Sequence, residues 1–267
     1  MRSIAGFVIA MALACGTVHA AEPSSLVQAR ALYNAGDYDG AIAAAGQARS
    51  DPAGADAAAL VEARAYLERY RRNADPADVA AARESLNAVR PSALSPRDQV
   101  DFFVGLGQSL YLSDLFGAAA ELFETALDRD ALLPPRDRLL LLDWWATALD
   151  REAQWGAPDR RARLFAEIAS RMEDELRRDP GSAPANYWLV VAARGTGDLD
   201  AAWDAAVAAW VRAALDPSTA EMLRSDVDRL VTEALIPERA HTRPAREQAD
   251  ATDALKAQWE LVKEQWR

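Results

Sequence analysis

The stretch from Phe103 to Leu127, FVGLGQSLYLSDLFGAAAELFETAL, decides the fold. Apolar and small residues recur in it at three- and four-residue spacing, in two runs separated by a short turn at residues 112–115. That spacing is typical of α-helices with one buried face. In the second run Ala119, Phe123 and Ala126 share a face, so the stretch predicts two helices packed side by side.

The second of these helices belongs to an internal repeat. Triads of mostly small residues at offsets of zero, four and seven recur in every second predicted helix, where they let another helix approach closely. The first members of successive triads are 40, 38, 43 and 40 residues apart. The triads are Ala41/Ala45/Ala48, Ala81/Ser85/Ala88, Ala119/Phe123/Ala126, Ala162/Ala166/Ala169 and Ala202/Ala206/Ala209. A helix pair repeated at this period predicts an α-solenoid.

Thirteen prolines divide the chain into segments of helical length, because proline interrupts a helix. No segment alternates apolar and polar residues with β-branched enrichment, so the sequence predicts an all-α fold without strands. Short loops favour antiparallel neighbours. Helices are expected at 24–35, 38–50, 55–73, 76–90, 96–113, 115–130, 135–153, 158–178, 183–195, 199–215, 218–235 and 245–266.

The repeating unit resembles the tetratricopeptide repeat. Three units match that family's pattern through Leu32, Gly36-Asp37-Tyr38, Ala41-Ile42 and Ala48; through Phe103, Leu106-Gly107, Leu110, Phe116, Ala119, Phe123 and Ala126; and through Leu189, Gly197-Asp198-Leu199, Ala202 and Ala209. The two intervening units lack the Leu-Gly element, and the period exceeds the roughly 34 residues of the family. The resemblance implies a right-handed α-solenoid of about five helical hairpins over residues 21–217.

In that family the first helix of each pair lines a concave groove that binds segments of other proteins. The resemblance therefore places outward side chains in this groove, namely Arg30, Tyr33, Asn34, Gln108, Tyr111, Tyr187 and Arg194. Tyrosine and arginine are common anchors at protein interfaces, and Arg30 and Arg194 suit a carboxylate or an acidic peptide. Alternatively, the tyrosines pack against neighbouring repeats and the arginines pair with local acids.

Beyond the repeats, residues 218–267 predict a helical cap. Leu255, Trp259, Val262 and Trp266 form one apolar stripe on the final helix, and a solenoid needs a terminal element to cover its last apolar face. The alternative is that this stripe docks another protein or assembles copies of the chain. Pro237–Pro244 is expected to be a polar linker that holds a solvated His241.

Residues 1–20 predict a signal peptide. Arg2 precedes a short apolar run, and Val18-His19-Ala20 fits a cleavage site before Ala21. We therefore expect an exported protein, periplasmic or secreted. Cys15 follows Ala12-Leu13-Ala14, which resembles a lipoprotein box, so lipidation of Cys15 and attachment to a membrane is the alternative.

Charge and composition narrow the classes of partner. The formal charge of −11 argues against a nucleic-acid binder, whose affinity comes mainly from phosphate neutralisation. No stretch reaches the roughly 20 apolar residues of a transmembrane helix. Cys15 is the only cysteine, so we expect neither a disulfide nor a thiolate metal site in the folded part.

No pattern of catalytic, cofactor-binding or metal-ligating residues is found. His241 is the only histidine outside the predicted signal peptide, Gly105-x-Gly107 lacks a preceding strand and a third glycine, and the carboxylate pairs are typical of solvated helix faces. We expect a scaffold without catalysis that binds a protein or peptide. The alternatives are a structural subunit that assembles through its terminal helices, and a small-molecule binder with a pocket around Trp144, Trp145, Trp155 and Trp188.

Overall fold

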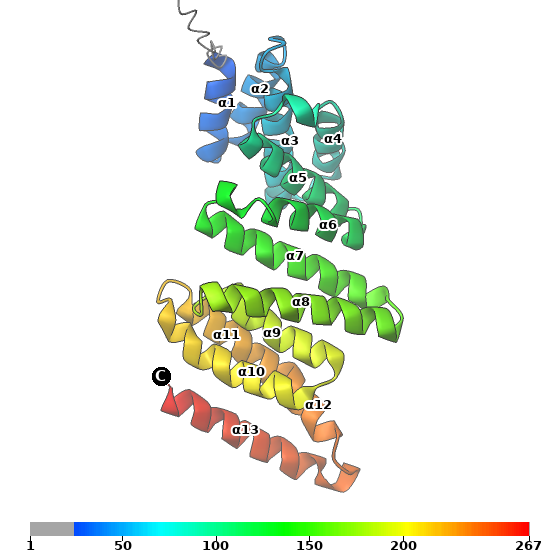
Figure 1. The fold of residues 1–267 in the computed structure, drawn as a ribbon, viewed down its shortest axis with the longest axis vertical. Coiled ribbons are helices and arrows are strands. Elements are labelled where there is room, and N and C mark those ends of the chain that lie inside the picture. The colour runs from blue at the N-terminus through cyan, green and yellow to red at the C-terminus, as the bar shows by residue number, and fades with distance from the viewer. Residues whose placement is uncertain (1–23, 267) are drawn as a thin grey trace, which may run out of the picture.

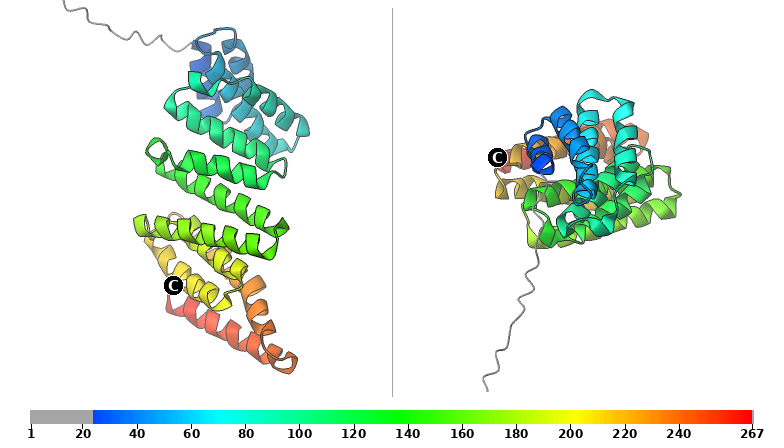
Figure 2. Two further views of the ribbon diagram at one scale, coloured as in Figure 1. Left: turned by 45° about the vertical axis from the view of Figure 1, so that its right-hand side comes forward. Right: turned by 90° about the horizontal axis from the view of Figure 1, so that it is seen from above.

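The computed structural model describes residues 24–266, and every regular element in this range is helical. The helices stack along one long axis, with the N-terminal helix at one end and the C-terminal helix at the other (Figures 1 and 2). The all-α prediction is confirmed for this range. The predicted signal peptide, residues 1–20, and Cys15 lie outside the described residues.

Consecutive helices pack against one another as a series of hairpins (Figure 1). The first ten are α1 (Ser24–Asn34), α2 (Tyr38–Ala48), α3 (Ala55–Asn73), α4 (Pro76–Asn87), α5 (Pro96–Tyr111), α6 (Phe116–Leu127), α7 (Pro135–Trp155), α8 (Pro158–Arg178), α9 (Ala183–Thr196) and α10 (Leu199–Arg212). The rest are α11 (Ala220–Leu230), α12 (Ile236–His241) and α13 (Gln248–Gln265), with short 3₁₀ turns between several helices.

Local signals start these helices where the sequence predicts. The side chains of Asp37, Ser95 and Asp198 each accept a hydrogen bond from a backbone N–H in the first turn of α2, α5 and α10. Proline occupies the first turn of α4, α5, α7, α8 and α9, where its missing N–H leaves no hydrogen bond unmade.

Small residues bring the paired helices close together. Ala41, Ala45 and Ala48 of the first triad are at most 1% exposed, and the third and fifth triads are buried to the same extent. Gly107 shows why the Leu-Gly element suits α5, because a Cβ atom there would lie 2.6 Å from the ring of Phe123 on α6.

One of the five triads was assigned to the wrong face, and a second is buried only in part. In α8 the buried side chains are Phe165, Ile168, Met172 and Glu175, while Ala162 and Ala166 are exposed and Ala169 is half-buried. In α4 the buried set is Asp78, Ala82, Ser85 and Leu86, so Ser85 of the predicted triad is buried, while Ala81 is half-buried and Ala88 is exposed. Large apolar side chains gain more from burial than alanine does, so they determine the orientation of α8.

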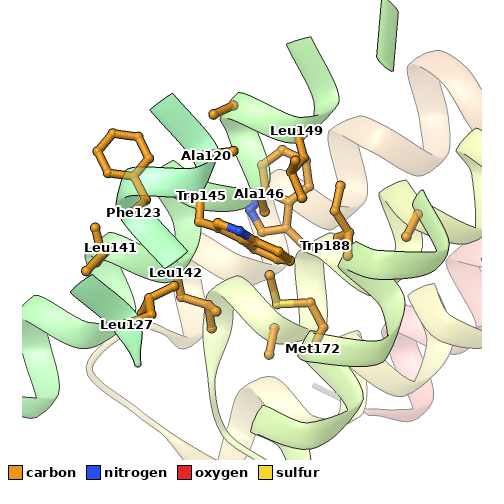
Figure 3. Packing of buried hydrophobic residues seen from close by; sticks show 14 of the residues in the cluster. Ala120, Phe123, Leu127, Leu141, Leu142, Trp145, Ala146, Leu149, Met172 and Trp188 are labelled. Atoms are coloured by element: carbon orange, nitrogen blue, oxygen red, sulfur yellow. The ribbon is translucent and has the colours of Figure 1, made fainter. Parts of the chain in front are cut away.

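The largest apolar cluster lies in the middle of the stack, between α6, α7, α8 and α9. Trp145 is 1% exposed at its centre and lies among Leu142, Leu149, Met172 and Trp188 (Figure 3). Trp145 and Met172 fill the space between α7 and α8, whereas α2, α6 and α10 each bury at least two alanines of their triads.

The predicted polar linker at Pro237–Pro244 is wrong for most of its length, because Ile236–His241 form α12. The helix continues past Leu230 through a π-helical turn at Val231–Leu235, in which the Ile236 N–H donates to the Val231 carbonyl. This wider turn precedes Pro237 and accommodates a residue that would disrupt a regular α-helix. His241 is exposed, as expected.

The last helix is held by one buried tryptophan. Trp259 is completely buried and packs edge-on against Trp203 and Trp210 of α10, with ring centroids 5.9 and 5.5 Å away. Its indole Nε1 donates a 2.7 Å hydrogen bond to Asp228 of α11. Trp266, on the same predicted stripe, is 46% exposed.

Within residues 24–266, no helix is both long enough and apolar enough to cross a lipid bilayer.

A second repeat is found in the turns between paired helices. Four of these turns contain a residue in the left-handed region, with φ between 53° and 85°. They are Gly36, Ala74, Asp114 and Gly197, which are 38, 40 and 83 residues apart. The first two spacings match the period of the triads, and the third equals two periods because Gly156 in the turn after α7 has a negative φ. Two of the four carry a Cβ atom, which this backbone conformation disfavours.

Replacing Ala74 by glycine is therefore expected to stabilise the protein by about 1 kcal/mol. The matched reverse change is Gly197→Ala, where a Cβ atom would meet no atom within 4 Å, so that only backbone strain is introduced. It should destabilise by a similar amount. Urea unfolding measures both, and a lower midpoint for Ala74→Gly would contradict the assignment.

Trp259→Ala is expected to cost about 3–5 kcal/mol, because it leaves a large cavity between α10, α11 and α13. Trp266→Ala, on the same helix, should cost about 1 kcal/mol or less. The two unfolding midpoints in urea test whether Trp259 alone anchors the final helix; equal losses would show that it does not.

Candidate functional site

A groove with a volume of about 690 Å³ lies on one side of the stack, and α1, α3, α5 and α7 supply most of its lining. We call it the N-terminal groove. Because alternate helices of the stack line it, its wall is formed by the first helices of four successive hairpins. Side chains from residues more than 100 positions apart, such as Arg30 and Trp144, therefore line a single surface.

Five of the seven side chains predicted for the groove lie in or beside it. Arg30, Tyr33, Asn34 and Gln108 line the N-terminal groove. Tyr111 lines a smaller pocket that adjoins it and shares Gln108. The other two predicted residues, Tyr187 and Arg194, line neither cavity.

The walls of the groove are charged, and most of the charges are paired across helices. Arg30 of α1 donates to both carboxylate oxygens of Asp98 on α5, each at 3.1 Å. Arg64 of α3 pairs with Asp101 of α5 at 2.7 Å. Burial raises the pKa of Asp101, and the charges of Arg64 and Arg97 oppose that effect. The first contact joins the first hairpin to the third, and the second joins the second hairpin to the third. Both of these groove acids are therefore already paired within the chain.

The groove keeps a small positive excess within an acidic chain. Five arginines and four carboxylates line it, whereas the whole chain has a formal charge of −11. Among residues 24–266, Arg71 forms an ion pair only with Glu68, one turn earlier, and its side chain is 57% exposed. Arg136 is exposed and forms no ion pair with any residue between 24 and 266. These two guanidinium groups are the cations most accessible to a ligand.

Tyr33 lines the groove, but its ring packs against neighbouring side chains of the chain itself. The guanidinium carbon of Arg64 lies 4.7 Å from the centre of its ring, and Tyr38 packs against it at 5.8 Å. Burial raises the pKa of its phenol. The two alternatives predicted for the tyrosines were lining the groove and packing against neighbouring repeats. Tyr33 lines the groove and also packs against other side chains.

An apolar pocket of about 360 Å³ opens beside the groove. Tyr111, Phe123 and Trp144 line it together with Leu67 and Leu112. Arg71, Gln108 and Trp144 line both the pocket and the groove, so the two cavities adjoin. In the described part of the chain, no other residue forms a hydrogen bond with the Gln108 side-chain amide.

Farther along the stack, the predicted anchors are engaged within the chain. Arg194 forms a two-pronged ion pair with Glu238 of α12, with contacts of 2.6 to 3.1 Å. Tyr187 packs edge-on against Trp188 at 5.6 Å. Arg30 and Arg194 therefore do pair with acids of this chain, but the acids lie on distant helices, 68 and 44 residues away, and Arg30 still lines the groove.

No protein-family model matches this chain, and no curated protein or solved structure shows significant similarity to it. The site is therefore defined by the side chains of this protein alone.

The four tryptophans considered for a small-molecule pocket do not enclose one. Trp145 and Trp188 are buried in the central core, and Trp155 is 84% exposed on the surface. Trp144 lines the apolar pocket beside the groove, and Trp145 borders a separate hollow that is lined mainly by charged side chains of α6 and α8. Within residues 24–266, no three histidine, cysteine, aspartate or glutamate side chains gather to hold a metal ion.

Sequence reasoning missed Arg71, Arg136 and Trp144. Arg71 and Arg136 lie on first helices of the second and fourth hairpins, which lack the Leu-Gly element and so received no groove assignments. A register carried across from the matching units would have placed them on the same wall. The sequence suggested Trp144 for a small-molecule pocket. Its place in the pocket beside the groove, together with Tyr111, is apparent only in the folded structure.

Asp143→Asn is expected to stabilise the protein at neutral pH. Asp143 lines the apolar pocket and accepts a 2.8 Å hydrogen bond from Trp188 Nε1. Burial raises the pKa of its carboxyl, and that hydrogen bond only partly opposes the effect. An acid whose pKa rises on folding lowers the stability of the folded state once it ionises, so the stability falls as pH rises through the raised pKa. Asparagine keeps an oxygen acceptor without the charge.

The measurement is the urea midpoint of both proteins at about pH 7 and about pH 4. The gain from Asp143→Asn should be present at pH 7 and shrink at pH 4, where the native carboxyl is increasingly protonated. The same gain at both pH values would contradict this explanation.

Proposed function

We propose that this chain is an exported scaffold, without catalysis, that binds a segment of another protein in the N-terminal groove. The observation that carries the proposal is the apolar pocket of Tyr111, Phe123 and Trp144 beside a groove with exposed arginines. An apolar anchor site surrounded by polar groups is the usual arrangement at protein-recognition surfaces. Export rests on the signal peptide predicted from residues 1–20.

The chemistry of the groove favours a particular kind of segment. One large apolar side chain of the segment would fill the pocket, and a carboxylate would pair with Arg71 at its rim. The existing pair of Arg71 with Glu68 is surface-exposed, and such pairs contribute little, so Arg71 is available for exchange. Gln108 would supply hydrogen bonds to the backbone of the segment.

The proposal includes a right-handed solenoid of the tetratricopeptide-repeat type. The close contact of Gly107 with Phe123, the buried alanine triads and the turns spaced at roughly 40 residues support it. The cap assigned to residues 218–267 agrees with the burial of Trp259 against α10.

A second candidate is a subunit that assembles through its terminal helices, tethered to a membrane if Cys15 is lipidated. The observation that favours it is the outer side of α13, where Leu261 is 65% and Trp266 46% exposed. It differs from the first candidate in leaving the groove unused.

The deciding experiment is crosslinking in cells followed by mass spectrometry, with the double variant Gln108→Ala/Tyr111→Ala. The variant is expected to reduce recovery of a discrete partner by about tenfold or more, because it removes an anchor and a hydrogen-bonding group from the pocket. Trp266→Ala is the matched control and should leave recovery unchanged. Circular dichroism checks that each variant is folded.

Equal recovery from all three proteins would overturn the groove proposal. If Trp266→Ala alone abolishes recovery, the terminal-helix candidate replaces it.

A further inference from the structure

The apolar pocket beside the N-terminal groove is lined by three aromatic rings and one carboxyl group. The rings belong to Tyr111 of α5, Phe123 of α6 and Trp144 of α7. Phe123 and Trp144 have ring centroids 6.0 Å apart, and Tyr111 packs edge-on against Phe116 at 5.1 Å. Asp143, the residue before Trp144, lines the same pocket. An acid therefore lies among side chains that suit a flat ring.

The carboxylate of Asp143 has a partner on only one of its oxygens. Oδ1 accepts the 2.8 Å hydrogen bond from Trp188 Nε1, whereas Oδ2 accepts none from any residue between 24 and 266. Burial raises the pKa of this carboxyl, the Trp188 hydrogen bond opposes the rise, and the charge of Asp226 on α11 adds to it. An ionised carboxylate only accepts hydrogen bonds, so Asp143 has room for a donor that a ligand supplies.

Two neutral polar side chains line the pocket together with this acid. Thr147 follows Asp143 by one turn of α7, so the two residues share one side of the helix. Gln108 lines the pocket from α5. In the part of the chain that the structure describes, no other residue forms a hydrogen bond with either side chain. Because a hydroxyl and an amide can both donate, the pocket offers an acceptor in Asp143 and donors in Thr147 and Gln108.

These polar groups discriminate among the large side chains that could enter the pocket. Phenylalanine or leucine would displace water from Asp143 without supplying a donor, which leaves a desolvated acceptor unpaired. Lysine would place a full positive charge near Arg71, which lines the same pocket. The indole of tryptophan donates but does not accept. A phenol hydroxyl both donates and accepts, so it matches both kinds of polar group.

We propose that the pocket receives a tyrosine side chain of the bound segment, with its ring beside Trp144 and its hydroxyl donating to Asp143. This inference rests on the proposed groove function and names the anchor residue that the groove recognises. A hydrogen bond to a carboxylate is stronger than one between neutral groups, so Asp143 selects for the hydroxyl. With Arg71 at the rim, the preferred segment combines a tyrosine with a nearby acidic residue.

Asp150 provides a matched control for Asp143. It lies seven residues later on the same side of α7, and burial raises the pKa of its carboxyl too. Its side chain accepts a 3.0 Å hydrogen bond from Gln154. Asp150 lines neither the apolar pocket nor the N-terminal groove, so the same substitution can be made inside and outside the site.

The test uses small probes with the purified protein, so it does not require the natural partner. N-acetyl-tyrosinamide, N-acetyl-phenylalaninamide and the O-methyl ether of the tyrosine probe are titrated, and each Kd is measured by protein-observed NMR. The tyrosine probe should bind about tenfold more tightly than the phenylalanine probe, because only it supplies the donor. The methyl ether keeps the oxygen but cannot donate, so it should bind no more tightly than the phenylalanine probe.

Three variants assign this preference to the pocket. Asp143→Asn should lower the tyrosine preference to about threefold or less, because a neutral acceptor forms a weaker hydrogen bond than a carboxylate. Asp150→Asn should leave the preference at its wild-type value. Tyr111→Ala should weaken both the tyrosine and the phenylalanine probe, since it removes a ring from the pocket wall. Urea unfolding checks that each variant is folded.

Four results would overturn the tyrosine assignment: a tyrosine probe that does not bind, one that binds no better than phenylalanine or the methyl ether, a preference that Asp143→Asn leaves unchanged, or tighter binding of N-acetyl-tryptophanamide. The groove function is tested separately by partner recovery in cells. Loss of the partner from Gln108→Ala/Tyr111→Ala, without a tyrosine preference among the probes, would retain the groove function and reject the tyrosine anchor. Unchanged recovery would reject the groove function whatever the probes show.

Discussion

Close approach of helices through small residues is the interaction on which the rest of this structure depends. Ala41, Ala45 and Ala48 in α2, and their counterparts in α6 and α10, are almost completely buried. Gly107 leaves just enough room for Phe123. Where two helices meet through such residues, the stack can continue with the same geometry from one hairpin to the next, and interiors of this density leave no space for larger side chains.

The stacking determines the chemistry of the groove. Because α1, α3, α5 and α7 line one surface, arginines of α1 and α3 meet carboxylates of α5, as in the pairs of Arg30 with Asp98 and Arg64 with Asp101. These partly buried ion pairs connect the helices that line the groove, and they leave Asp98 and Asp101 already paired with arginines. What remains for a ligand is the apolar pocket, with Arg71 at its rim and Arg136 farther along the groove.

The hairpin of α7 and α8 departs from the alanine rule, and its unusual features follow from that departure. Trp145 and Met172 fill the space between its helices (Figure 3), so α8 turns its large side chains inward and leaves Ala162 and Ala166 exposed. The same orientation places Arg163, Glu167 and Asp174 on the outside. An exposed charged face and a long projecting tip thus belong to the repeat whose two helices are separated by Trp145 and Met172.

The sequence alone determined the helical content, the positions of most helices and the repeat, because proline, capping residues and apolar spacing act on the local backbone. Even so, the local pattern around Pro237 failed to predict that Ile236–His241 is helical and follows a π-helical turn. Only the tertiary structure decided which predicted anchors face a ligand. Arg194 is engaged by Glu238, 44 residues away, while Gln108 and Tyr111 meet Trp144 in a pocket. Such contacts depend on how whole helices are oriented against one another, and that orientation is set by the summed packing of large side chains, which no local pattern contains.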